Sequence, residues 1–311
     1  MMRHIKILNI RICIIVLLAI TACACATKGH EPRPLSEIGK ELRAGLRASP
    51  YGPRTPFPEP SYWRKSGESM ASRFRNSVPA VIWIVSTMEA TDENVHSDTF
   101  ASRTKLNMPP SGTAYENIIF NKADKNEEYI DLFDRAGFRV WLQVEPAQAD
   151  VVTLIDLVMK RYSSHPSVIG FGIDVEWYKW SKDVNPEGAG VSDAEARLWS
   201  ERVRSYNPYY RLFLKHWLVS KMPPTYREGI VFLDDSQEFR TLDEMVAEFQ
   251  LWGKAFAPSP VGFQFGYPAD RAWWQKLKNP PRDIGKSILE KISNTSDLYW
   301  VDFSLKQIWP Y

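Results

Sequence analysis

Apolar and polar residues follow a repeating order along the chain from Val78 onward. Short runs rich in β-branched and aromatic residues are separated by longer stretches in which apolar residues recur with a helical period. Strands are predicted over 80–85, 117–120, 139–144, 168–175, 211–217, 229–233, 261–265 and 298–303. Helices are predicted over 125–136, 150–162, 192–206, 241–256 and 282–293.

Two of the predicted helices begin with a capping-box spacing, Ser192 with Glu195 and Thr241 with Glu244. Nearly continuous apolar strands that alternate with helices are typical of a parallel sheet covered on its outside. Eight such units at this length favour a single-domain (β/α)₈ TIM barrel. A doubly wound open sheet is the alternative, but the segment 86–89 after the first predicted strand lacks the glycine-rich phosphate turn of those folds.

The chain begins with a pattern typical of an export signal. Basic residues precede an apolar run over 12–20, which is too short to span a membrane. The run leads through small residues to Cys23 and resembles the lipobox of bacterial lipoproteins, a resemblance that implies lipidation of Cys23. We therefore expect a signal peptide over 1–23 and export as a membrane-anchored lipoprotein of the cell envelope. Ordinary secretion after cleavage near Ala24 or Ala26 is the alternative.

The next segment is rich in proline. Seven prolines lie between residues 28 and 60, with few large apolar residues apart from a helical candidate over 35–46. Such segments are stiff and extended. The predicted organisation is therefore a signal peptide over 1–23, a proline-rich tether and lead-in over 24–77, and the barrel over 78–311.

Composition narrows the choice of partners. All three cysteines, Cys13, Cys23 and Cys25, precede the predicted barrel, so its fold is expected to rest on its core without disulfides. The net charge is +2 with both signs interspersed, which argues against nucleic acid as a partner and leaves the lipid anchor as the expected contact with the membrane. The 12 tryptophans offer flat faces for sugars, although many must fill the core.

Candidate chemistry gathers where the predicted strands end, which is where TIM barrels place their active sites. Asp174 and Glu176 close an apolar strand, and strand alternation would place both on one face with Cα atoms about 6.5–7 Å apart. Other polar and aromatic residues at strand ends are candidate substrate contacts. They are Gln143, Glu145, Trp177, Tyr178, Lys215, His216, Trp217, Asp234, Asp235, Gln264, Tyr267 and Trp300.

A pair of carboxylates at such a spacing suits cleavage of a glycosidic bond. Loss of water would raise the pKa of Glu176, which fits a general acid, and Asp174 would need hydrogen-bond donors to stay ionised. The structural alternative is an ion pair of these acids with Lys215 or Arg211. Glu145 is a candidate second partner or alternative base.

The segment 170–177, Gly-Phe-Gly-Ile-Asp-Val-Glu-Trp, resembles the fourth-strand signature D-G-F-D-I-D-W-E of family-18 glycoside hydrolases, the chitinases and related endoglycosidases. The resemblance implies a TIM barrel in which Glu176 protonates the leaving oxygen and Asp174 orients the acetamido group whose oxygen attacks. Tyr267 and Gln264 would contact the substrate. The two earlier aspartates of the signature are replaced by Ile169 and Gly172. An Asp-x-Glu strand also occurs in family-25 lysozymes.

The expected function is that of an exported glycoside hydrolase, with Glu176 and Asp174 as catalytic residues and an amino-sugar glycan such as chitin or peptidoglycan as substrate. A carbohydrate-binding barrel without catalysis and a scaffold of the cell envelope are the alternatives. No cofactor or metal is expected, because the histidines show no paired ligand spacing.

Overall fold

The computed structural model describes residues 41–52, 56–89 and 103–310. The predicted signal peptide, Cys23 and residues 24–40 and 53–55 of the predicted tether lie outside these residues. Export and lipidation therefore stay predictions. Within the described residues, each helix is too short or too polar to cross a membrane.

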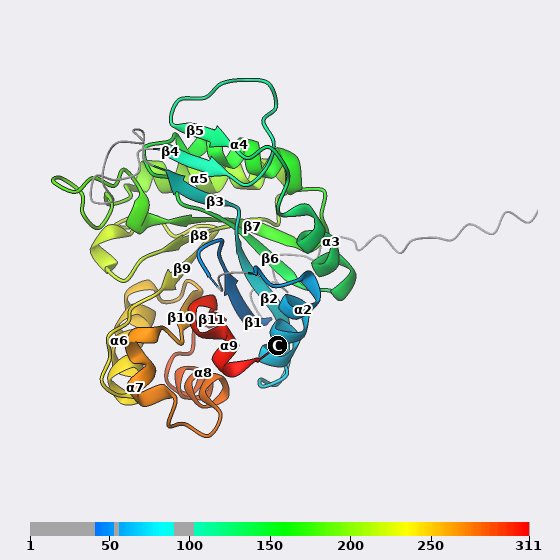
Figure 1. Cartoon of the computed structure of the whole chain (residues 1–311). Coiled ribbons are helices and arrows are strands. Elements are labelled where there is room, and N and C mark those ends of the chain that lie inside the picture. The colour runs from blue at the N-terminus through cyan, green and yellow to red at the C-terminus, as the bar shows by residue number, and fades with distance from the viewer. Residues whose placement is uncertain (1–40, 53–55, 90–102, 311) are drawn as a thin grey trace, which may run out of the picture. The chain divides into compact units, whose positions relative to one another are not determined.

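Eight parallel strands close into a barrel (Figure 1). In order around the barrel they are β1 (Leu42–Ala48), β2 (Ser77–Ile84), β6 (Arg139–Val144), β7 (Val168–Asp174), β8 (Arg211–Lys215), β9 (Ile230–Asp234), β10 (Val261–Phe265) and β11 (Thr295–Val301), which pairs again with β1. The predicted (β/α)₈ barrel is confirmed.

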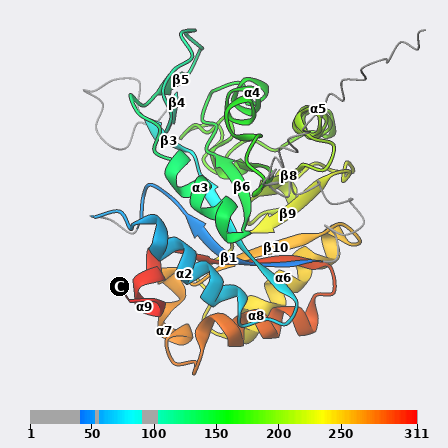
Figure 2. The same cartoon turned by 90° about the vertical axis from the view of Figure 1, so that its right-hand side faces the viewer.

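Helices surround the strands on the outside, as the view turned by 90° shows (Figure 2). The longer ones are α2 (Pro60–Ala71), α3 (Glu127–Ala136), α4 (Val151–Tyr162), α5 (Asp193–Tyr206), α6 (Leu242–Phe256) and α8 (Pro280–Lys291); α7 (Arg271–Trp274) and α9 (Leu305–Ile308) are single turns. The capping box at the start of α5 is present in both directions. At the start of α6, Thr241 accepts from the Glu244 backbone N–H, but the Glu244 carboxylate bonds to the N–H of Arg240 instead.

The predicted boundary of the barrel at residue 78 is wrong, and so is the helical candidate over 35–46 where the structure describes it. Residues 42–48 form β1, which pairs with β2 and β11. Arg43 and Arg47 are buried and bond to Asp297 and Asp302, which are 254 and 255 residues away in the chain. Their spacing of four looks helical in sequence. It arises from strand alternation, which turns both cations toward acids on and just after the neighbouring strand β11.

The predicted strand over 117–120 does not belong to the barrel. It forms β5 (Ile118–Phe120), which joins β3 (Ser86–Glu89) and β4 (Arg103–Leu106) in a separate three-stranded sheet. This small sheet follows the end of β2 (Figure 1). Because β1 was missing from the prediction and this strand was extra, the predicted total of eight was right although one of the eight strands was wrong.

The interior of the barrel is mostly apolar and tightly packed. Buried side chains from five strands fill it: Ala80, Ile82, Trp141, Phe213, Val231, Leu233 and Tyr299. Trp141 meets Phe213 edge to face, with ring centroids 5.4 Å apart. Gly172 makes room for this packing, because a Cβ atom there would lie 2.0 Å from the Phe213 ring. Apart from the buried Arg43–Asp297 ion pair, which lies against Trp141, hydrocarbon therefore fills the barrel below the strand ends.

Candidate active site

The C-terminal ends of four neighbouring strands bring charged side chains together. Glu145 follows β6, Asp174 ends β7, Lys215 ends β8 and Asp235 follows β9. The Lys215 Nζ atom lies 2.9 Å from Asp174 Oδ2 and also contacts Asp235 Oδ2. All four side chains are buried. Parallel strands finish at the same end of the barrel, so residues up to 90 positions apart become neighbours here.

Asp174 is anchored on one oxygen. Its Oδ2 accepts from Lys215 and, at 3.4 Å, from the side-chain amide of Gln143. Its Oδ1 is buried and has no hydrogen-bond partner among the described residues. Burial raises the pKa of Asp174, and the Lys215 charge opposes this rise. The alternative of a structural ion pair is therefore found for Asp174, and its partner is Lys215 rather than Arg211.

Glu176 does not lie on a strand, so the expected geometry of two acids on one strand face is wrong. β7 ends at Asp174, and residues Val175–Trp177 form a 3₁₀ turn that carries Glu176. The side chain is half-buried. Burial, followed by the negative charge of Asp174, raises the pKa of Glu176 to about 8, while the Lys215 charge lowers it. Glu176 is thus a carboxyl group that stays mostly protonated near neutral pH.

Glu145 forms a second perturbed carboxyl group in the same cluster. It is 2 % exposed, and the Tyr51 hydroxyl donates a hydrogen bond to its Oε2 at 2.5 Å. The Met88 backbone N–H donates to the Tyr51 oxygen at 3.1 Å. Burial, followed by the Asp174 charge, raises the pKa of Glu145 to about 7, and the hydrogen bond from Tyr51 opposes the rise. Tyr51 was missed in the sequence because it falls in the segment interpreted as a tether.

Arg47 of β1 is the other residue near this cluster that sequence reasoning missed. Its guanidinium bonds to Asp302 at 2.9 Å and to Ser49 at 3.3 Å, and it lies 4.9 Å from the centroid of the Phe303 ring. Its charge lowers the pKa values of Glu145 and Asp174. Only the assignment of 42–48 as a strand could have pointed to it.

Several buried polar atoms near the strand ends have no hydrogen-bond partner within the described part of the chain. Besides Asp174 Oδ1, they are Gln143 Oε1, Asp235 Oδ1 and Gln264 Nε2. The other side of the Gln264 amide accepts from the Tyr267 hydroxyl at 3.1 Å. Buried polar atoms without partners are costly, and they are frequent where a ligand or ordered water completes the bonding. Both donors and acceptors are present, which suits a ligand rich in hydroxyl or amide groups.

Three predicted contacts are bonded to groups outside this cluster. His216 is buried with both ring nitrogens bonded to backbone, Nδ1 to the Leu218 N–H at 2.8 Å and Nε2 to the Glu187 carbonyl at 2.9 Å. Burial lowers its pKa to about 4. Asp234 accepts from the Ser236 N–H, and strand alternation turns it away from the barrel interior.

Trp300 is the third of these predicted contacts. It is fully buried, donates from its indole to Ser304 at 2.9 Å and packs against Phe265, Trp274 and Trp309 in the layer between barrel and helices. It fills the core there and is not exposed to a ligand at the strand ends.

The remaining aromatic candidates follow the strand ends. Trp177 and Trp217 are half-buried, with Trp177 packed 6.1 Å from Trp180 and Trp217 stacked on His216. Tyr178 is buried, and its hydroxyl donates to Glu195 of α5 at 2.6 Å. Trp177 and Trp217 keep exposed surface close to the charged cluster.

One group of side chains in the described residues has metal-ligand spacing. Glu127 and Asp131 of α3 and His165 place one ligand atom each within 4.8 Å of one another. His165 precedes β7 and so lies at the opposite end of that strand from Asp174. Its Nδ1 is already bonded to Asp134 at 2.7 Å. This group is separate from the carboxylate cluster and plays no part in its chemistry.

No protein-family model and no curated protein sequence matches the chain. Solved structures similar to it include endo-glycoceramidase II from Rhodococcus sp., with 10 % identity, coverage of 84 % of this chain and 73 % of that chain, and a TM-score of 0.42. The catalytic domain of the major endoglucanase from Xanthomonas campestris pv. campestris has 14 % identity, coverage of 77 % and 79 %, and a TM-score of 0.38.

A β-D-glucuronidase from Dictyoglomus thermophilum is similar with 12 % identity over 56 % of this chain and a TM-score of 0.39. This chain spans about a third of the glucuronidase, 35 % of its length. The fold assignment rests on the strand order and closure of the barrel described above.

Proposed function

We propose that the protein is a glycoside hydrolase in which Glu176 acts as general acid. The observation that carries the proposal is a half-buried glutamic acid, with its pKa raised to about 8, in a cluster of carboxylates at the C-terminal end of a barrel. A carboxyl group that keeps its proton at neutral pH can donate it to the oxygen of a leaving sugar. Its neighbours Asp174, Asp235 and Glu145 supply negative charge that favours the positive charge developing on the sugar ring.

Asp174 would bind and orient the substrate rather than transfer a proton. Its Oδ2 is held by Lys215, and its buried Oδ1, without a partner in the described residues, can accept a hydrogen bond from a substrate N–H. This supports an N-acetylated amino sugar whose acetamido oxygen attacks the sugar carbon, the arrangement implied by the family-18 resemblance. Chitin and peptidoglycan contain such sugars.

The replacement of one family aspartate by Gly172 has a local reason. The Phe213 ring occupies the space that a side chain at 172 would need. Asp174 therefore has a lysine rather than a second aspartate as its partner, and it orients substrate as an anion instead of sharing a proton. Glu145, held by Tyr51, is the alternative base if water rather than the acetamido oxygen attacks.

A carbohydrate-binding barrel without catalysis is the second candidate. It is favoured by Lys215, whose ion pairs to Asp174 and Asp235 offset part of the negative charge of these two carboxylates. Such a protein would still offer the unpartnered polar atoms and the half-buried tryptophans to a sugar.

Release of reducing ends from chitin, peptidoglycan and related glycans separates the two candidates. Glu176→Gln should abolish release while binding survives, and Glu290→Gln on the exposed face of α8 should behave as wild type. If wild-type protein is inert on the whole panel yet is retained on one glycan, the binder is correct. If it neither cleaves nor binds any of them, both proposals fail.

The proposed location is the bacterial cell envelope, with Cys23 as the lipidated residue. Incorporation of labelled palmitate into the full chain, and its loss in Cys23→Ser, would support the anchor. Release of unlabelled wild-type protein into the medium would favour ordinary secretion instead.

A further inference from the structure

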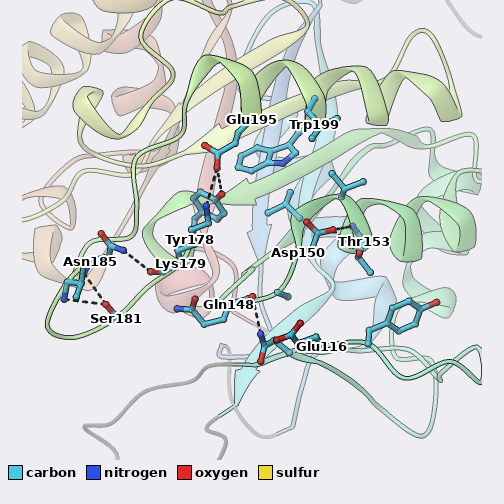
Figure 3. A pocket seen from close by; sticks show the side chains of 17 residues that line it. Glu116, Gln148, Asp150, Thr153, Tyr178, Lys179, Ser181, Asn185, Glu195 and Trp199 are labelled. Atoms are coloured by element: carbon cyan, nitrogen blue, oxygen red, sulfur yellow. Dashed lines mark hydrogen bonds and ion pairs between the residues drawn. The ribbon is translucent and has the colours of Figure 1, made fainter.

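An open groove lies beside the barrel, and we call it the side groove (Figure 3). Its volume of about 880 Å³ falls within the range of ligand pockets. Its walls come from four separate stretches of chain: residues 115–117 before β5, 148–153 at the start of α4, 178–185 after β7, and 195–199 of α5.

Two of these walls begin directly after the glutamates of the candidate active site. Gln148 follows Glu145 by three residues, and Tyr178 follows Glu176 by two, which limits the separation of their Cα atoms to about 7–11 Å. The Lys179 N–H donates to the Ala147 carbonyl at 2.9 Å and joins the two walls. The side groove therefore starts beside the carboxylate cluster.

The backbone around the side groove is held in an unusual shape. Asn117, Ala147 and Lys179 all have positive φ, at 57°, 45° and 48°. Side chains tie the walls together, since the Asn117 amide donates to the Gln148 carbonyl at 3.2 Å and the Gln148 amide donates to the Trp180 carbonyl at 2.7 Å. Backbone strain of this kind persists where surrounding contacts enforce it, and it is concentrated at ligand sites.

The lining suits sugar. It combines side-chain amides and hydroxyls with apolar and aromatic surface, and Leu198 and Val184 are 53 % and 78 % exposed. The charges are three acids and one lysine, namely Glu116, Asp150, Glu195 and Lys179. Lys179 is itself paired with Glu195 at 3.1 Å. The resulting negative balance disfavours anionic chains and leaves uncharged polysaccharide as the ligand that matches the hydrogen-bonding groups.

We infer that the side groove binds an uncharged glycan chain next to the bond that is cut, so that cleavage takes place within chains rather than at their ends. The inference rests on the proposed function for the cleavage step, while the binding step stands apart from it. It requires a longer oligosaccharide to gain contacts that a disaccharide cannot reach.

Calorimetry on the Glu176→Gln protein tests the binding step without hydrolysis. The probes are hexamers and dimers of β-1,4-linked N-acetylglucosamine, glucose and xylose, with a galacturonate hexamer as the anionic comparison. We expect at least one uncharged hexamer to bind more tightly than its dimer. Gln148→Ala, added to this protein, should weaken hexamer binding roughly fivefold through a lost hydrogen-bonding side chain and affect the dimer less.

A second variant avoids the structural hydrogen bond of Gln148. Leu198→Glu places a charge on the exposed groove wall of α5, and Leu251→Glu makes the same change on the exposed face of α6, where the leucine is 59 % exposed. The first should weaken hexamer binding and the second should not.

The inference is overturned if no uncharged hexamer binds, if the galacturonate hexamer binds best, or if both leucine variants bind alike. These results are distinct from failure of the proposed function. Hexamer binding that depends on the side groove, with no cleavage by wild-type protein, removes the hydrolase and the cleavage step of the inference but leaves the binding step. Cleavage of short chromogenic glycosides without hexamer binding at the groove removes only the inference.

Discussion

Lys215 is the cation that contacts both Asp174 and Asp235, and its removal tests the electrostatics of the site. Its charge lowers the pKa of Glu176, of Asp174 and of Glu145. Lys215→Met keeps most of the side-chain length and removes the charge. The pKa of Glu176 should therefore rise above about 8 in the variant.

The magnitude follows from the titration of Glu176. With a pKa of about 8, about 90 % of the group is protonated at pH 7, against about 0.3 % at its ordinary value of 4.5, a gain of roughly 300-fold in available acid. A unit charge about 10 Å away at an effective dielectric constant near 20 is worth about 1.7 kcal/mol, or roughly one pH unit. In Lys215→Met, the pH above which activity is lost should therefore be higher than in wild type by roughly one unit.

The assay is kcat/KM against pH from about 5 to 10 on the glycan that the wild-type protein cleaves. Wild-type activity should fall about tenfold per pH unit above about 8, as Glu176 loses its proton. Lys215→Met should be slower, because Asp174 loses the cation that holds its Oδ2 in place, and its fall should begin at higher pH. Lys254→Met, on the exposed end of α6, is the matched control and should follow wild type.

The same variant has a stability cost, which must be measured first. Removing Lys215 leaves Asp174 and Asp235 buried without their cation, which typically costs about 3–5 kcal/mol of unfolding free energy at neutral pH. Circular dichroism should confirm that the variant is folded at the assay temperature. The reasoning is refuted if the folded variant loses activity at the same pH as wild type, or if the wild-type fall begins near pH 4–5.

Two further predictions concern the barrel interior and are measured as urea unfolding free energies. Arg43→Met should cost about 3–5 kcal/mol at pH 7, because the Asp297 carboxylate, bonded to Arg43 at 2.7 and 2.6 Å, stays buried without its cation. Arg43 lowers the pKa of Asp297, so the stabilisation from this ion pair is lost as the pH falls and Asp297 becomes protonated. The difference in unfolding free energy between wild type and Arg43→Met should therefore shrink in acid. A difference that stays constant with pH would contradict this explanation. Gly172→Ala should lower the unfolding free energy by about 1–3 kcal/mol, since its Cβ would lie 2.0 Å from the Phe213 ring. In the control Gly190→Ala, the nearest atom to the new Cβ is 3.7 Å away, and the unfolding free energy should change by less than about 0.5 kcal/mol. Equal effects of the two substitutions would refute the packing argument.

Much of the barrel could be predicted from the local pattern of apolar and polar residues. Seven of its eight strands lie where apolar periodicity predicts them. So do five of its long helices, namely α3, α4, α5, α6 and α8, two of which also begin at predicted capping residues. The position of Asp174 at the end of a barrel strand, near Lys215, also followed from the pattern. These features depend on residues close together in the chain, and a buried parallel strand needs a continuous apolar run whatever its neighbours are.

Other features depended on partners far away in the chain. β1 carries two arginines inside the barrel, and they are stable there because β11 and the residue after it supply Asp297 and Asp302. Nothing within residues 42–48 reveals those partners, so the strand resembled a helix next to a tether. Tyr51 beside Glu145 was hidden for the same reason.

The difference has one physical origin. Hydrophobic periodicity reports which side of an element is removed from water, and this can be judged from a short segment. The burial of a charge is favourable only when an opposite charge or hydrogen-bonding group meets it, and for Arg43 that group lies 254 residues away. Chain pattern therefore predicted the barrel, whereas closure of the barrel selected which charged residues lie inside it and which carboxyl groups meet at its end.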